Sequence, residues 1–88
     1  MIIDVRTAEE FAAGHLDGAV NIDLQSADFA DRIATLDPSG SYVVYCRSGN
    51  RSGQAQSYMK SIGFGDVENA GSVESASTSL GLPIVVGP

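Results

Sequence analysis

The sequence predicts one α/β domain with a parallel sheet of about four strands flanked by helices. Short apolar segments with strand character alternate with segments of helical periodicity, a pattern typical of parallel sheets joined by right-handed crossovers. The length of 88 residues allows a single core, so we treat residues 1–88 as one domain. Hydrophobic residues make up 43% of the chain, which is enough to fill such a core and argues against disorder.

The N-terminal segment predicts a strand followed by a brief helix. Residues 2–5 (Ile-Ile-Asp-Val) predict a short buried strand. Thr7 and Glu10 follow with the spacing of a capping box, in which each side chain bonds the backbone N–H of the other residue. We expect this helix to stop near Gly14, and residues 14–19 to form a turn.

A second, very short strand and a second helix are predicted next. Residues 20–22 have strand character, and Ser26 or Asp28 is placed to cap the helix that follows. The inward face of that helix is marked by apolar residues at helical spacing, namely Phe29, Ile33 and Leu36. Residues 37–40 (Asp-Pro-Ser-Gly) are a strong break.

The second half of the chain predicts two further strands and a longer helix. Residues 42–45 are the most β-prone run and predict a central strand. The helix after it has an apolar repeat at i, i+3, i+4 and i+7, formed by Ala55, Tyr58, Met59 and Ile62. Gly63 then stands where a helix C-cap glycine belongs, and residues 66–69 predict a fourth strand. The Ser-rich residues 72–79 predict a short helix or a loose segment, and the apolar residues 82–86 are expected to pack down.

The chain is acidic, and its few basic residues are concentrated in one turn. The formal net charge of −6 disfavours nucleic acid and anionic membranes as partners. Only five residues are basic, and Arg47 and Arg51 both lie in residues 46–51, which indicates a small anionic ligand. No apolar run approaches the ~18 residues of a membrane span, and residues 2–5 read as a strand rather than a signal peptide. We therefore expect a soluble cytoplasmic protein, or a periplasmic one if the chain is a processed form.

Cys46, the only cysteine, stands where the central strand ends and a helix follows. A strand, a tight polar turn and a helix form an anion cradle, because the N–H groups of the turn and the positive end of the helix point at one spot. A thiol placed there is held partly as thiolate. Asp4, Cys46 and Asn69 all follow or end predicted strands, and in parallel sheets ligands bind beyond the carboxyl ends of the strands. We expect these ends to meet at one edge, with Cys46 near the middle.

Four short motifs form a recognisable series along residues 2–72. They are Asp4-Val5-Arg6 with Glu10-Phe11, Gly-His-Leu-Asp-Gly-Ala at 14–19, Cys-Arg-Ser-Gly-Asn-Arg-Ser at 46–52, and Val-Glu-Asn-Ala-Gly at 67–71. On these residues the chain resembles the rhodanese-like sulfurtransferase family in a short, single-domain form of the phage-shock type. It lacks the strand and helix that usually precede the first motif. It also departs from the family at Gly71-Ser72, where many members have Gly-Gly followed soon by Trp.

The resemblance implies a thiosulfate sulfurtransferase, or rhodanese, with Cys46 as its nucleophile. The thiolate attacks the outer sulfur of thiosulfate or a similar donor and holds that sulfur as a persulfide. An acceptor such as cyanide, a thiol or a protein then takes the sulfur. The resemblance implies no metal and no cofactor. The substrate-binding residues that it implies are the rest of the turn, Arg47, Ser48, Gly49, Asn50 and Arg51.

The individual residues of the turn and its surroundings carry further expectations. Arg47 is the expected entrance residue, whereas Arg51 closes the loop and either meets the anion or pairs with Asp4 or Glu10. Gly49 is expected to adopt a backbone angle that a side chain would forbid. Three polar residues are candidates to bond the loop or cap the helix, namely Ser48, Asn50 and Ser52.

Several residues near the turn are expected to be structural rather than chemical. The charged residues that we expect to support the loop from behind are Asp4, Arg6 and Glu10. His15 is expected to be structural because it belongs to a matching structural motif.

Two other functions use a similar turn. Cys-dependent phosphatases and arsenate reductases, as related families, have five residues between Cys and Arg, whereas this chain has four between Cys46 and Arg51. The tighter ring suits a single sulfur rather than a tetrahedral oxyanion. A non-catalytic rhodanese-like binding module is the second alternative, but such modules typically lose the cysteine that this chain retains. A carrier that hands the sulfur to a protein partner shares the same chemistry, and at this size we expect a monomer.

Overall fold

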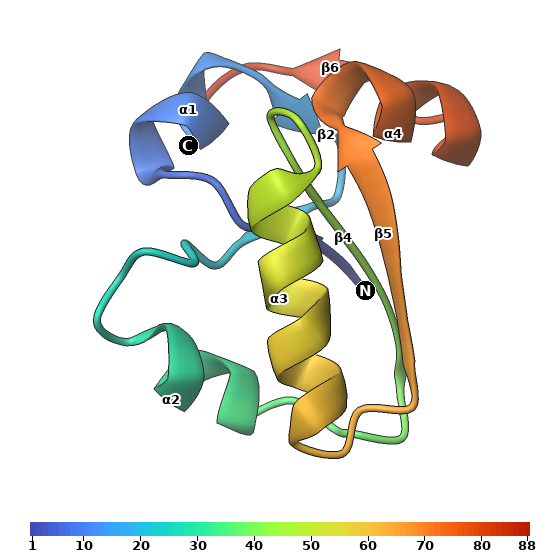
Figure 1. Ribbon diagram of the computed structural model, residues 1–88. Coiled ribbons are helices and arrows are strands. Elements are labelled where there is room, and N and C mark those ends of the chain that lie inside the picture. The colour runs from blue at the N-terminus through green and yellow to red at the C-terminus, as the bar shows by residue number, and fades with distance from the viewer.

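The computed structural model describes residues 1–88 and has four helices and six short strands. In chain order the elements are β1 (Ile2–Asp4), α1 (Ala8–Ala13), β2 (His15–Leu16), β3 (Val20–Asn21), α2 (Phe29–Ala34), β4 (Ser41–Cys46), α3 (Asn50–Ser61), β5 (Asp66–Ser72), α4 (Val73–Leu80) and β6 (Ile84–Val85). The main sheet has the order β3-β1-β4-β5, and every pairing in it is parallel. This confirms the predicted parallel sheet of four strands. It also places β4, which ends in Cys46, in the interior of the sheet. Figure 1 shows β4 and β5 side by side.

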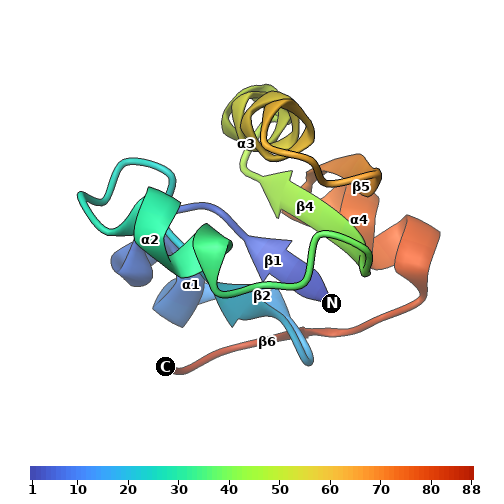
Figure 2. The ribbon, with the colours of Figure 1, turned by 90° about the horizontal axis from the view of Figure 1, so that it is seen from below.

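The two faces of the sheet are covered by different elements (Figure 2). Helices α2 and α3 cover one face and enclose the larger core, whose buried residues are Ile3, Val5, Ile22, Phe29, Ile33, Tyr42, Val44, Cys46, Ala55, Met59, Phe64 and Val67. On the other face, α4 and β2 enclose a smaller cluster of Leu16, Tyr45, Val73 and Ala76. Because side chains alternate along a strand, Cys46 shares a face with Val44, and Tyr45 points the opposite way. Cys46 therefore lies on the side of the sheet that α3 covers.

Helix α1 begins and ends as the sequence predicts. The Thr7 hydroxyl accepts a hydrogen bond from the Glu10 N–H at 3.2 Å, and the Glu10 carboxylate accepts one from the Thr7 N–H at 3.2 Å. This reciprocal pair confirms the capping box. The helix ends at its C-cap residue, Gly14.

The expectation that residues 14–19 form only a turn is wrong. His15 and Leu16 form β2, which pairs antiparallel with β6 near the end of the chain. The partner of His15 is Val85, which lies 70 residues further along the chain, so no local pattern predicts the pairing. This pairing also explains how the C-terminal tail packs down. The tail is nevertheless only partly covered, because Ile84 is 47% exposed and Val86 is 78% exposed.

Helix α2 has the predicted inward face but not the predicted cap. Phe29 and Ile33 are buried, and Leu36 packs against the same core. Asp28 holds the N-cap position, but its side chain makes no capping bond. Instead, its carboxylate accepts a hydrogen bond from the Ser26 hydroxyl. Both predicted capping side chains therefore bond each other rather than the helix.

Helix α3 departs from the predicted pattern at its last position. Ala55 and Met59 are buried, and Tyr58 packs against the core, as the repeat predicts. Ile62 is 43% exposed, because the helix ends at Ser61 and Ile62 has left the helical conformation as the C-cap. Gly63 follows with a φ of +107°, the left-handed conformation expected of a residue that ends a helix.

The last part of the chain is more regular than predicted. Strand β5 runs from Asp66 to Ser72, three residues beyond the predicted end. The Ser-rich segment forms helix α4, and the Ser72 hydroxyl caps it by accepting a hydrogen bond from the Ser75 N–H at 3.0 Å. All four helices are too short or too polar to span a lipid bilayer.

Candidate active site

The segment between β4 and α3 is the tight turn that the sequence predicts. Cys46 is the last residue of β4 and is fully buried, and α3 begins at Asn50. Gly49 has a φ of +95°, in the left-handed region that favours glycine. A Cβ atom at Gly49 would also lie 3.4 Å from the Cα atom of Gly71 in β5. A Cβ atom would therefore fit beside β5, and it is the backbone angle that selects glycine at position 49.

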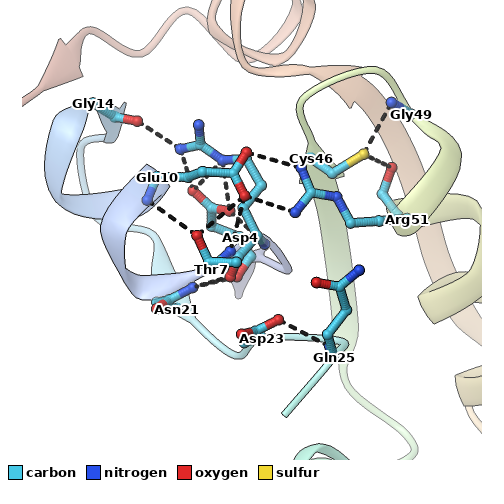
Figure 3. Close-up of polar contacts among 12 residues, drawn as sticks. Asp4, Thr7, Glu10, Gly14, Asn21, Asp23, Gln25, Cys46, Gly49 and Arg51 are labelled. Carbon is cyan, nitrogen blue, oxygen red and sulfur yellow. Dashed lines mark hydrogen bonds and ion pairs between the residues drawn. The ribbon is translucent and has the colours of Figure 1, made fainter.

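The sulfur of Cys46 lies among hydrogen-bond donors (Figure 3). The Gly49 N–H donates to Sγ at 2.9 Å, and the Ser52 hydroxyl oxygen lies 3.4 Å from it. Burial raises the pKa of the thiol, but hydrogen bonds from the Ser52 side chain and from the backbone N–H groups of Ser52, Ser48 and Gly49 outweigh this effect. The pKa of Cys46 is therefore lowered from its ordinary value. The arrangement stabilises negative charge on the sulfur.

Arg51 is held by Glu10 rather than left free in the loop. The two guanidinium nitrogens donate to the two Glu10 carboxylate oxygens at 2.7 Å and 2.9 Å, which is a bidentate ion pair (Figure 3). The hydrogen bond from Arg51 is the main reason that the pKa of Glu10 falls from 4.5 to about 2. Of the two interactions that the sequence left open for Arg51, the structure shows the ion pair with Glu10. This pair ties the first turn of α3 to α1.

Asp4 and Arg6 form a separate ion pair behind the site. Both side chains are buried, and their closest contact is 2.7 Å. The Arg6 guanidinium also donates to the Gly14 carbonyl at 2.6 Å, so it links the end of β1 to the end of α1. The Asn21 amide closes the cluster by donating to the carbonyls of Asp4 and Arg6. The three charged residues expected to support the loop therefore lie in two ion pairs, of which only the Glu10 pair touches it.

The remaining loop residues face outward. Arg47, Ser48 and Asn50 are exposed, and neither ion pair of the structure involves Arg47. The Ser48 hydroxyl accepts only a long hydrogen bond, 3.5 Å, from the Asn50 N–H. Arg47 is consequently the one cation of the turn whose charge is not already paired.

Ser52 and Asn69 contribute more to the site than the sequence indicated. Ser52 does not cap α3. It is fully buried in the first turn of the helix, and its hydroxyl oxygen lies 2.7 Å from Asn69 Oδ1. The Asn69 amide donates in turn to the Gly49 carbonyl at 3.1 Å. The sequence predicted Asn69 to lie at the end of a strand, but no local pattern predicted its hydrogen-bond partners. A polar residue at the carboxyl end of a predicted strand is the signal that could have drawn attention to it.

His15 has a structural environment. It is buried, its ring stacks on Phe11 with 3.6 Å between ring centroids, and its Nδ1 lies 2.8 Å from the Phe11 carbonyl oxygen. No group of three or more His, Cys, Asp or Glu side chains is arranged to hold a metal ion.

Known proteins share this arrangement of sequence and structure. A family model described as "Rhodanese-like domain" matches residues 1–75. The chain is 38% identical over 87 residues to the thiosulfate sulfurtransferase PspE of Escherichia coli (strain K12), a match that covers 97% of this chain and 78% of PspE. It is 41% identical over 66 residues to the thiosulfate sulfurtransferase GlpE of Pseudomonas aeruginosa (strain LESB58). That match covers 75% of this chain and 58% of GlpE.

Solved structures show the same fold. A rhodanese from E. coli, determined with anions, superposes with a TM-score of 0.80 at 35% identity and covers 98% of this chain and 96% of its own. The Rhodanese_3 like domain of the Alr3790 protein from Anabaena sp. superposes with a TM-score of 0.85 at 27% identity, covering 100% of this chain and 93% of that domain. Since the family model matches most of the chain and PspE matches nearly all of it, this protein belongs to the family of rhodanese-like domains.

Proposed function

We propose that this protein is a sulfurtransferase that carries a sulfane sulfur on Cys46 as a persulfide. One observation supports this most directly: a single buried thiol at the end of β4 has a lowered pKa because N–H and O–H donors surround it. The thiolate is the nucleophilic form of cysteine. Thiosulfate is the donor we propose, because the relatives PspE and GlpE are named thiosulfate sulfurtransferases.

The reaction needs two displacements at sulfur and no external redox partner. The Cys46 thiolate attacks the outer sulfur of thiosulfate, a new S–S bond forms, and sulfite leaves with the electron pair of the broken S–S bond. The acceptor then attacks the outer sulfur of the persulfide, and the Cys46 thiolate leaves. With cyanide the product is thiocyanate. The N–H groups of the turn stabilise the anionic sulfur before and after each step.

Arg47 is the residue that we propose for binding the oxygen-bearing end of thiosulfate. It is exposed at the rim of the turn, and its guanidinium has no carboxylate partner. Arg51 supports the loop through Glu10 instead of meeting the donor directly. We propose that Ser48, Gly49 and Asn50 contribute through their backbone, since the exposed side chains of Ser48 and Asn50 lie outside the ring of donors.

Mass spectrometry of the intact protein tests the proposal. After incubation with thiosulfate, the wild type should gain the mass of one sulfur atom and should then convert cyanide to thiocyanate. Cys46→Ser should do neither, because Cys46 is the only thiol of the chain. If the Ser variant kept its activity, or if the wild type gained no sulfur, the persulfide mechanism would be refuted.

The acceptor, assembly and compartment are part of the same proposal. We propose a small thiol or cyanide, or a thiol of a partner protein, as the acceptor, and a single rhodanese-like domain over residues 1–88 that works as a monomer. We propose the cytoplasm as the compartment, because an unpaired catalytic thiol remains reduced there. Size-exclusion chromatography with light scattering tests the monomer, and cell fractionation tests the compartment.

A further inference from the structure

The hydroxyl of Ser52 faces two acceptors but carries one proton. Its oxygen lies 2.7 Å from Asn69 Oδ1 and 3.4 Å from Cys46 Sγ. Ser52 is fully buried, so water does not offer it a further partner. Because a hydroxyl donates a single hydrogen bond, donation to the amide and donation to the sulfur exclude each other.

The orientation of the Asn69 amide decides which acceptor Ser52 meets. Nδ2 donates to the Gly49 carbonyl at 3.1 Å, and the Gly71 N–H donates to Oδ1 at 3.0 Å. A flipped amide would set two N–H groups against each other at Gly71 and two oxygens against each other at Gly49. The atom that faces Ser52 is therefore an oxygen, and it is the nearer of the two acceptors.

We propose that Asn69 is a positioning residue that competes with Cys46 for the proton of Ser52 and thereby sets the acidity of the thiol. In the thiol form, Ser52 donates to Asn69 and its oxygen accepts from the Cys46 S–H. When the thiol loses its proton to a base in the solvent, the Ser52 hydroxyl rotates and donates to the thiolate. The Ser52 proton is not transferred, and Asn69 Oδ1 keeps the hydrogen bond from Gly71. Ionisation of Cys46 therefore requires that the hydrogen bond between Ser52 and Asn69 be given up.

This competition predicts that the loss of Asn69 shifts the pKa of Cys46 in the direction opposite to the one expected if Asn69 only anchored the loop. If Asn69 only held the loop through the Gly49 carbonyl, its loss would loosen the N–H donors around the sulfur and raise the pKa of Cys46. If Asn69 draws the Ser52 proton away, its loss frees the hydroxyl for the thiolate and lowers that pKa. The sign of the change separates the two roles.

A pH titration of Cys46 followed by NMR measures this sign. The chain has one cysteine, so protein labelled with ¹³C at the cysteine Cβ gives one signal whose shift follows ionisation without a reagent having to reach the buried sulfur. We expect Asn69→Ala to lower the pKa of Cys46 by about 0.7, because ionisation then no longer breaks the neutral hydrogen bond between Ser52 and Asn69. Ser52→Ala should raise it. In the Ser52→Ala background, Asn69→Ala should no longer lower the pKa of Cys46, because the hydroxyl proton for which Asn69 and Cys46 compete is absent.

Two further variants keep the test decisive. Asn69→Val retains a side chain of similar width and suits a strand position, so it serves if the Ala variant folds poorly. Gln56→Ala is the matched control, because Gln56 also bridges α3 and β5, by donating to the Val67 carbonyl at 2.8 Å, but does so away from the sulfur. It should leave the pKa of Cys46 unchanged.

Either of two results overturns the inference. One is a pKa that is unchanged or raised in the folded Asn69 variants, and the other is a lowering that persists without Ser52. The inference rests on the proposed role of Cys46 as the sulfur carrier, but the titration reads the thiol itself. A failed titration would leave the mass-spectrometric test of the persulfide untouched, and a missing persulfide would leave the titration valid.

Discussion

Replacing Glu10 by Gln should show how much the ion pair with Arg51 stabilises the protein. Glu10 joins α1 to the first turn of α3 through two hydrogen bonds, of 2.7 Å and 2.9 Å. A Gln at this position keeps the shape of the side chain and can still complete a capping box with Thr7. The change therefore removes the charge of the pair and one of its two hydrogen bonds, because a Gln amide offers Arg51 a single acceptor oxygen.

The expected loss follows from the pKa of Glu10 and from its exposure. Its fall from 4.5 to about 2 would correspond to about 3.4 kcal/mol at 1.36 kcal/mol per unit if all of it appeared as stability. The side chains of Arg51 and Glu10 are 21% and 28% exposed, so solvent screens part of their attraction. We expect Glu10→Gln to lower the free energy of unfolding by about 1–2 kcal/mol at pH 7.

The stability difference between the wild type and Glu10→Gln should depend on pH in one direction. Because the pKa of Glu10 is lower in the folded state, the stabilisation is fully present above the ordinary value of 4.5 and is lost as the pH falls toward about 2. Urea unfolding of the wild type and of Glu10→Gln, at neutral pH and at several pH values below 4.5, measures the difference. The two proteins should differ at neutral pH and should converge as Glu10 becomes protonated.

A neighbouring carboxylate provides the control. Glu9 lies on the same helix turn, is exposed and takes part in neither ion pair, so Glu9→Gln should change stability by less than about 0.5 kcal/mol. Equal stability of Glu10→Gln and the wild type at pH 7 would refute the reasoning. A difference that stayed constant down to the lowest pH would refute it as well, because it could not come from the charge of Glu10.

Three other predictions concern the turn. Arg47→Ala should raise the KM for thiosulfate about tenfold, a loss of about 1.4 kcal/mol of binding, whereas the exposed control Lys60→Ala should leave the KM unchanged. An unaltered KM in Arg47→Ala would show that Arg47 does not bind the donor. Gly49→Ala should lower the free energy of unfolding in urea by about 1–3 kcal/mol because of its φ of +95°, whereas Gly65→Ala should not, since Gly65 has open space and no left-handed φ; equal losses would contradict this account. Turnover of an aryl phosphate should be negligible, because only four residues separate Cys46 from Arg51, and rapid hydrolysis would favour a phosphatase instead.

The features that the sequence predicted well depend on local signals. The capping box of Thr7 and Glu10 spans four residues, and the end of α3 is signalled by a single residue, Gly63, with its positive φ. The site turn is equally local, because a strand end, a glycine and a helix start fall within residues 46–50. In each case the physical cause lies within one or two turns of chain, so the residues themselves contain the information.

The features that the sequence missed depend on contacts between distant segments. The antiparallel pairing of His15 with Val85 requires the tail to return across the molecule, and residues 14–19 alone are compatible with a turn. Ile62 fits the helical repeat by position, but where α3 stops decides its exposure. Asn69 is a polar residue in a strand until the fold brings it to the carbonyl of Gly49. Such roles exist only after the elements have packed together.

The geometry of the turn formed by residues 46–52 also depends on partners outside the turn. Within the turn, the side-chain contacts are those of the Cys46 sulfur with the Gly49 N–H and the Ser52 hydroxyl, and the long contact between Ser48 and Asn50. From outside the turn, Glu10 of α1 holds Arg51, and Asn69 of β5 holds the Gly49 carbonyl through its amide. Donors that are fixed in this way need no rearrangement when negative charge forms on the sulfur. The same seven residues placed on another strand and helix, without a partner equivalent to Glu10, should therefore hold a less acidic thiol.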